Sequence, residues 1–167
     1  LMDEAQFELF SKEMEIDFAI SKPGLGRFRV NVFMQRGNIA MVLRYITMDL
    51  PSLDDLGVPP ILKDLIMFRR GLVLMVGAAG NGKSTTLAGM INYRNDRTSS
   101  HILTVEDPIE FLHPNKRSII NQREVGVDTA SYARALKSAM RAAPDVIIIG
   151  EIRDRESMAV PYTQLHV

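Results

Sequence analysis

A glycine-rich segment of eight residues constrains the fold of this 167-residue chain more than any other feature. Residues 77–84 read Gly-Ala-Ala-Gly-Asn-Gly-Lys-Ser, which matches the phosphate-loop pattern G-x-x-x-x-G-K-[ST] at every fixed position. The apolar run 72–76 precedes the segment, and the pattern after it predicts a helix that begins near Lys83. A strand, a glycine loop and a helix in this order predict a site for phosphate groups; the alternative is a glycine-rich turn that binds nothing.

The residue types in this segment suit the binding of a nucleoside triphosphate. Glycines let the backbone turn so that successive N–H groups point at phosphate oxygens, and the helix adds the positive end of its dipole. Lys83 is expected to reach the β- and γ-phosphates, and the Ser84 hydroxyl is expected to ligate Mg²⁺. We therefore predict ATP and Mg²⁺ as cofactors, bound by Gly77, Ala78, Ala79, Gly80, Asn81, Gly82, Lys83, Ser84 and Thr85.

Apolar runs on both sides of the loop predict an α/β fold built on a parallel sheet. Strands are expected at 72–76, 101–105, 119–123 and 146–149, and helices at 83–93 and 131–142. Ser131 is expected to cap the second of these helices. The run 72–76 is apolar throughout, as is typical of a parallel strand covered on both faces. Strands that alternate with helices predict a doubly wound, RecA-like core.

Residues 16–46 predict a different, antiparallel unit. Within 27–33 the even positions are apolar and most odd positions are polar, which is the period of a half-buried strand. Turn residues at 23–26 and 37–38 separate this strand from its neighbours. Three prolines and one glycine in residues 51–60 favour a linker there. We predict a first domain at 1–50, a linker at 51–60 and the phosphate-loop core at 61–167, which opens with a short helix at 61–68.

Charge and composition exclude several classes of protein. Twenty basic and twenty acidic residues leave no net charge to attract nucleic acid, so no nucleic-acid partner is predicted. No apolar run reaches the ~18 residues that a membrane span needs. The absence of cysteine excludes disulfides and thiolate metal sites and favours an intracellular location. Leu1 and the unusual residues 159–167 lead us to expect a fragment of a longer protein.

Acidic residues follow two of the predicted parallel strands. The strand at 101–105 runs into Glu106-Asp107-Pro108-Ile109-Glu110, and the strand at 146–149 into Gly150-Glu151. Ligands bind beyond the carboxyl ends of parallel strands, where Mg²⁺ and an attacking water need carboxylates. We predict that Glu151 serves the metal or the nucleophile and that Glu110 is the base that orients water. The alternative is that these acids are solvated loop residues.

Residues 71–157 resemble the secretion and type IV pilus motor ATPases, most of all the retraction ATPases of the PilT and PilU type. Four segments carry the resemblance, namely 76–85, 105–111, 122–126 and 144–154. The second segment resembles the aspartate box of the family, whose closing glutamate is Glu110 here. The fourth resembles its atypical Walker B element, in which Glu151 follows a glycine. Residues 67–74 and the Arg-Glu-Ser-Met after Asp154 favour the PilU branch, and residues 16–46 resemble the end of the family's PAS-like N-terminal domain.

The resemblance implies a motor subunit that binds and hydrolyses ATP in a hexameric ring, made of this protein alone or mixed with a related retraction ATPase. It implies a cytoplasmic ring against the inner membrane at the pilus base, with a platform protein of that membrane as partner. It also implies that Arg29 and Arg44 reach a nucleotide, in some cases that of a neighbouring subunit; the alternative is that both face solvent. The family's histidine box has no match in 159–167, so we expect the chain to bind ATP but hydrolyse it poorly on its own.

Three other functions are compatible with the sequence. The first is an assembly-type secretion ATPase of the same superfamily, which pushes rather than pulls. The second is an accessory subunit that binds nucleotide without hydrolysis, although Lys83, Glu110 and Glu151 are all present. The third is a DNA-translocating ring, which the balanced charge disfavours.

Overall fold

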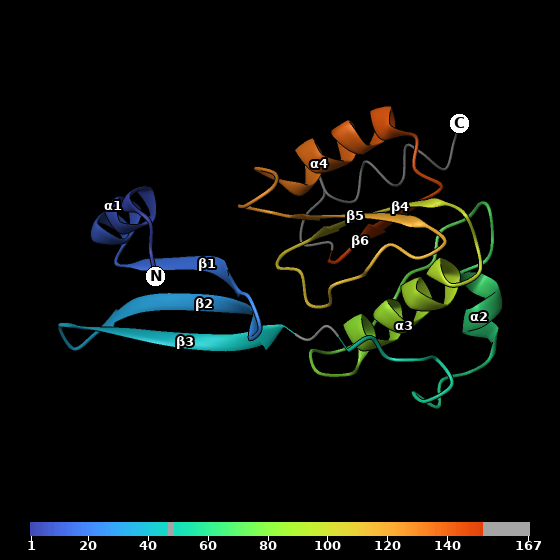
Figure 1. The fold of residues 1–167 in the computed structure, drawn as a ribbon, viewed down its shortest axis with the longest axis horizontal. Helices are drawn as coiled ribbons and strands as arrows, with labels where there is room; N and C mark the ends of the chain where they lie inside the picture. The colour runs from blue at the N-terminus through green and yellow to red at the C-terminus, as the bar shows by residue number, and fades with distance from the viewer. Residues whose placement is uncertain (47–48, 152–167) are drawn as a thin grey trace. The chain divides into compact units, whose positions relative to one another are not determined.

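The structure, a computed structural model, describes residues 1–46 and 49–151 and divides the chain into two compact units. The first unit is Leu1–Met48 and the second is Asp49–Val167. The first holds an antiparallel sheet and the second a parallel sheet (Figure 1). The predicted α/β class, with an antiparallel meander ahead of a parallel core, is confirmed.

The first unit is a three-stranded meander with one helix against it. Its elements are helix α1 (Glu4–Glu13) and strands β1 (Glu15–Lys22), β2 (Gly26–Gln35) and β3 (Asn38–Ile46), in the spatial order β1-β2-β3. Phe10 of α1 packs on Ile16, Phe18, Val30 and Val32, which are all buried. Val30 and Val32 lie at the even positions of β2, as the alternation predicted.

Helix α1 was not predicted from the sequence. Its first turn is closed by a capping box, in which Asp3 accepts from the Gln6 N–H at 2.8 Å and Gln6 Oε1 accepts from the Asp3 N–H at 3.0 Å. Such a box satisfies two N–H groups that a helix start otherwise leaves without partners. The polar start and the buried Phe10 together fix this short helix on the sheet.

The second unit is a parallel sheet between two helices (Figure 1). Its strands β4 (His101–Glu106), β5 (Ile119–Glu124) and β6 (Val146–Ile149) lie in the order β5-β4-β6. Leu103 and Val105 face helix α4 (Tyr132–Ala139), which continues as a 3-10 turn, η1 (Met140–Ala142). Ile102 faces helix α3 (Lys83–Asn95) on the other side of the sheet. Alternate residues of β4 therefore belong to two separate cores.

Residues 51–56 pack on helix α3. Leu53 is 4% exposed, and a Cβ added at Gly89 of α3 would lie 3.1 Å from its Cδ2 atom. This segment was predicted to be a linker because of its prolines. It lies in the second unit and covers α3, ahead of the short helix α2 (Ile61–Leu65).

The prediction of a buried strand at 72–76 is wrong. The structure has no regular secondary structure at residues 71–78, and Leu72, Val73, Leu74 and Val76 are 45–92% exposed. A strand forms only where a neighbour takes up its backbone N–H and C=O groups. Neither edge strand of the parallel sheet, β5 or β6, pairs with this run among the described residues. Apolar composition alone does not make a strand here.

Candidate functional site

The phosphate loop is an open turn that leads into helix α3. Gly80 and Gly82 have φ values of 81° and 74°, which lie in the left-handed region that glycine adopts without strain. Gly82 caps α3 without a side-chain hydrogen bond, and the first helical bond runs from the Thr86 N–H to the Gly82 carbonyl at 2.8 Å. Helix geometry leaves the N–H groups before Thr86 without an acceptor inside the helix. These N–H groups can bind an anion.

Lys83 folds back over this loop. Its Nζ atom donates to the carbonyls of Gly77 and Ala78, both at 2.8 Å. An ammonium group that bonds two neutral carbonyls can exchange them for phosphate oxygens at little cost in free energy, because a charged oxygen is the stronger hydrogen-bond acceptor. The loop therefore fits a phosphate group by its glycine conformations, by its N–H groups and by the position of this lysine.

The acidic ends of β4 and β6 meet at one edge of the parallel sheet. Val105 pairs with Ile149, and the Gly150 N–H donates to the Val105 carbonyl at 2.8 Å. A Cβ added at Gly150 would lie 3.3 Å from the Cα of Glu106. This close approach explains why glycine stands where many phosphate-loop proteins have aspartate. It also brings Glu106 and Glu151 to the same edge, as predicted for acids that follow parallel strands.

Glu110 has an exposed side chain on a fixed backbone. It lies in residues 107–113, which connect β4 to the chain before β5. The residue before it, Ile109, is 3% exposed and anchors the segment in the protein. A carboxylate that faces solvent from an anchored segment is available to a bound ligand, as the prediction for Glu110 requires.

Glu106 is a functional candidate that the sequence did not single out. Its Oε1 atom accepts from the Thr104 hydroxyl at 2.6 Å and from Gln122 Nε2 at 3.1 Å. Burial raises the pKa of this carboxyl, and the hydrogen bonds from Thr104, Gln122 and the Glu110 backbone partly offset that rise. The sequence placed Glu106 in an acidic run but gave no sign of its burial.

Strand β5 supplies two more polar side chains that hold residues 107–113. Gln122 Nε2 donates to the Phe111 carbonyl at 2.8 Å, and Gln122 Oε1 accepts from the His113 N–H at 2.8 Å. Glu124, which is 4% exposed, accepts from the Ile109 N–H at 3.2 Å. Gln122 was part of a family-like segment in the sequence, but only the contacts reveal what it does.

Arg29 and Arg44 lie opposite each other in the antiparallel unit. They are paired in the register of β2 and β3, so both side chains are on one face of that sheet, as predicted. The Arg29 Nε atom is 3.7 Å from the Asp17 carboxylate. Both arginines belong to the first unit and the phosphate loop to the second, so their contact with a nucleotide stays a prediction.

The predicted Mg²⁺ donors suit the ion only together with a phosphate ligand. In residues 1–46 and 49–151, no three His, Cys, Asp or Glu side chains gather into a metal site. The predicted donors are the Ser84 hydroxyl and the Glu151 carboxylate. Magnesium is usually held by one or two protein groups together with substrate phosphates and waters, which this donor set matches.

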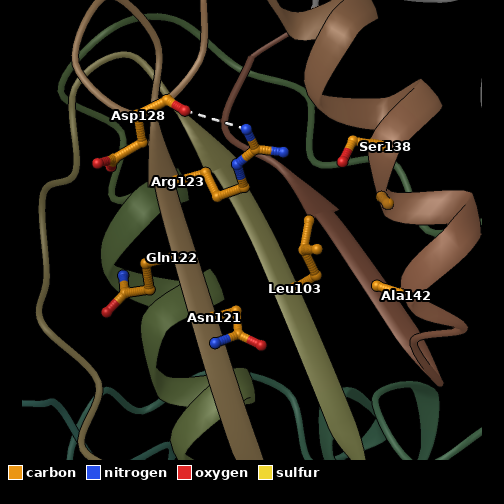
Figure 2. Close-up of a pocket in the computed structure, with 8 residues that line it drawn as sticks. Leu103, Asn121, Gln122, Arg123, Asp128, Ser138 and Ala142 are labelled. Carbon is orange, nitrogen blue, oxygen red and sulfur yellow. Dashed lines mark hydrogen bonds between the residues drawn. The ribbon is translucent and has the colours of Figure 1, made fainter.

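A hollow lies between β5 and α4 (Figure 2). It is an open cavity of about 380 Å³ that no loop residue lines. Arg123 projects toward α4, and its Nη2 atom donates to the Asp128 carbonyl at 3.0 Å. The lining residues are Leu103, Asn121, Gln122, Arg123, Asp128, Ser138, Ala139 and Ala142. None of the predicted site residues is among them.

No helix in the described part of the chain is both long enough and apolar enough to cross a membrane.

In comparisons with known proteins, a family model and individual relatives of the same kind match almost the whole chain. The family model described as type II/IV secretion system protein matches residues 12–163. The type IV pilus ATPase PilU of Pseudomonas aeruginosa is 52% identical over 158 residues, which make up 95% of this chain and 41% of that protein. The retraction ATPase PilT of the same species is 44% identical and covers 98% of this chain and 47% of its own length.

A solved structure gives the same result for the fold. The crystal structure of the pilus retraction motor PilT with bound ADP matches with a TM-score of 0.92 at 46% identity, over 95% of this chain and 46% of that one. The chain thus spans less than half the length of these relatives.

Proposed function

The chain belongs to the type II/IV secretion system protein family, and we propose that it is the ATP-binding and ATP-hydrolysing part of a type IV pilus retraction motor. The observation that carries the proposal is the phosphate loop, with Lys83 held on the carbonyls of Gly77 and Ala78 at the start of a helix that has no side-chain cap. The similarity to PilU and PilT supports the choice of a retraction motor over an assembly ATPase.

In this proposal the loop residues 77–85 hold the phosphates of ATP. The N–H groups at the start of α3 and the Lys83 ammonium would neutralise phosphate charge. Ser84 and Glu151 would hold Mg²⁺, which supplies further charge neutralisation at the phosphates. Glu110 would orient the attacking water and accept its proton. The exposed carboxylate of Glu110 and the shared edge of β4 and β6 support these roles.

The motor would act as a hexameric ring, of this protein alone or mixed with a related retraction ATPase. It would lie in the cytoplasm at the inner membrane, against a platform protein at the pilus base. Arg29 and Arg44 would then stabilise charge on the γ-phosphate, in some cases across a subunit boundary. Their pairing on one face of the β2–β3 sheet supports a shared role.

Nucleotide titration tests this function at the phosphate loop. We expect a fluorescent ATP analogue with Mg²⁺ to give a saturable signal with the wild-type chain. Lys83→Ala should weaken that binding by about tenfold or more, because a charge-assisted contact of at least ~1.4 kcal/mol is lost. Lys116→Ala removes a lysine that pairs with Asp96 outside the loop and serves as the matched control. Equal affinity of all three proteins would refute the proposal.

Phosphate release from ATP tests the catalytic part of the proposal. We expect slow hydrolysis by the chain alone and a further loss of about a hundredfold in Glu110→Gln, in line with the usual contribution of a general base. Binding of the analogue should stay unchanged in this variant, because Glu110 is outside the loop. A variant that hydrolyses ATP as fast as the wild type would remove Glu110 from the mechanism.

A further inference from the structure

We propose that Gln122 is a positioning residue that holds residues 107–113 on strand β5, so that Glu110 presents its carboxylate at a fixed place. The inference rests on the proposed function, since the placement of Glu110 matters only if the chain hydrolyses a nucleotide. Gln122 does not touch the phosphate loop in the described structure. Its side-chain hydrogen bonds go to the segment that carries the proposed base and to Glu106 just before it.

The Gln122 side chain acts as a substitute for a neighbouring strand. Its amide donates to the Phe111 carbonyl and accepts from the His113 N–H, each at 2.8 Å. In an extended chain the C=O of one residue and the N–H of the second residue after it point to the same side, where an adjacent strand would bind both. A primary amide has both the donor and the acceptor for this pairing, whereas a carboxylate lacks the donor.

The same amide also donates to a half-buried carboxylate, that of Glu106. Gln122 Nε2 also lies 3.1 Å from Glu106 Oε1, which accepts from the Thr104 hydroxyl at 2.6 Å as well. Glu124, two residues along the same face of β5, holds the Ile109 N–H at 3.2 Å. The backbone is therefore fixed on both sides of Glu110, while the Glu110 side chain is exposed. This arrangement limits the motion of the carboxylate to its own side-chain torsions.

Successive side chains of β5 lie on opposite faces of the sheet, so the contacts of Gln122 are separate from those of its neighbours in sequence. Gln122 points away from α4, whereas Arg123 projects toward it (Figure 2). Asn121, also on the α4 side, bonds His101 Nε2 at 2.8 Å. Asn121→Ala thus removes an amide of the same kind from the adjacent position without a contact to residues 107–113. It is a matched control for Gln122→Ala.

Steady-state hydrolysis and nucleotide affinity form the first test of this inference. We expect Gln122→Ala to lower kcat by about ten- to a hundredfold, because a small displacement of a catalytic group such as the Glu110 carboxylate lowers the rate by about that factor. The dissociation constant for Mg·ATP should stay within about twofold of the wild-type value, since the phosphate loop is untouched. Gln122→Glu keeps the shape but lacks the donor, and should be as slow as Gln122→Ala. Asn121→Ala should keep the wild-type kcat.

Hydrogen–deuterium exchange without nucleotide is the second test, and it does not depend on activity. We expect amides in residues 107–113 to exchange faster in Gln122→Ala than in Asn121→Ala, with residues 83–95 unchanged in both. Equal exchange in the two variants, or a kcat for Gln122→Ala that equals that of Asn121→Ala, would overturn the inference. If the wild-type chain failed to bind Mg·ATP, the proposed function would fall. The exchange rates would then still decide whether Gln122 holds the segment.

Discussion

At the scale of single residues, burial shifts the pKa of two side chains, one just before the segment 107–113 and one at its end. Glu106 precedes the segment, and burial raises the pKa of its carboxyl. His113 ends it, and burial together with the nearby Lys116 lowers the pKa of the imidazole from 6.5 to about 4. His113 is therefore neutral at pH 7, and its Nδ1 atom has no hydrogen-bond partner among the described residues.

The lowered pKa of His113 predicts a loss of stability in acid. Between pH 6.5 and 4 the unfolded chain binds a proton at this residue and the folded chain does not, so the free energy of unfolding falls as the pH falls. His113→Phe should reduce the difference between unfolding at pH 7 and at pH 4.5 by about 1–3 kcal/mol. Urea denaturation at the two pH values measures this. An unchanged difference would show that His113 is not buried in its neutral form.

The residues of the candidate site differ in how far the sequence could predict them. Lys83 and Ser84 follow from a motif in which residue type and spacing are fixed by the phosphates. Glu110 and Glu151 follow from their places after predicted strands. Gln122 could not be assigned a role, because its role comes from contacts with Phe111 and His113 across eleven and nine positions of chain. No local pattern marks such pairs.

At the scale of elements, helix α3 has a glycine where residues 51–56 lie against it. A Cβ added at Gly89 would be 3.1 Å from Leu53 Cδ2, 3.3 Å from Leu56 Cδ1 and 3.4 Å from the Pro51 carbonyl. Contacts below 3.4 Å are tighter than most real Cβ atoms make, so these neighbours must move if a side chain is added. The close approach of a non-helical segment explains a glycine in a helix interior.

Substitution of Gly89 by leucine tests this packing. Helix propensity alone would make Gly89→Leu more stable by about 0.8 kcal/mol, since leucine is a good helix former. We expect instead a net destabilisation of about 1–3 kcal/mol, because the new side chain overpacks against Leu53 and Leu56. Thermal or urea unfolding of the two proteins gives the difference. A more stable variant would mean that residues 51–56 do not pack on α3.

The elements also show where pattern reasoning works and where it fails. Strands β4, β5 and β6 and helices α3 and α4 were predicted within a few residues, and Ser131 caps α4 through the Arg134 N–H at 3.2 Å. Helix α1 was missed, although Asp3 with Gln6 three positions later is a capping signal. The prediction of a strand at 72–76 failed because a strand needs a neighbouring strand to pair with, and an apolar pattern does not show which strand lies beside it.

At the scale of the whole molecule, strand β3, which is an edge strand of its sheet in the described part of the chain, presents an apolar stripe. Ile39, Met41, Leu43 and Tyr45 alternate along one face of β3 and are 46–56% exposed. They continue the face on which Phe10 covers Ile16, Phe18, Val30 and Val32. The helix covers β1 and β2, and none of the four β3 residues belongs to that buried cluster. An exposed apolar edge strand favours pairing with another chain.

The stripe predicts concentration-dependent self-association of this chain, and Met41→Lys should reduce it. A lysine on an edge strand opposes pairing, and at a position that is 47% exposed it should change the free energy of unfolding by no more than about 1 kcal/mol. Because the chain has no net charge, any added charge could improve solubility, so Asn38→Lys at the polar start of β3 is the control. Light scattering after gel filtration, over a range of concentrations, separates the two effects. Equal masses for Met41→Lys and Asn38→Lys at every concentration would mean that charge, and not the apolar stripe, controls association.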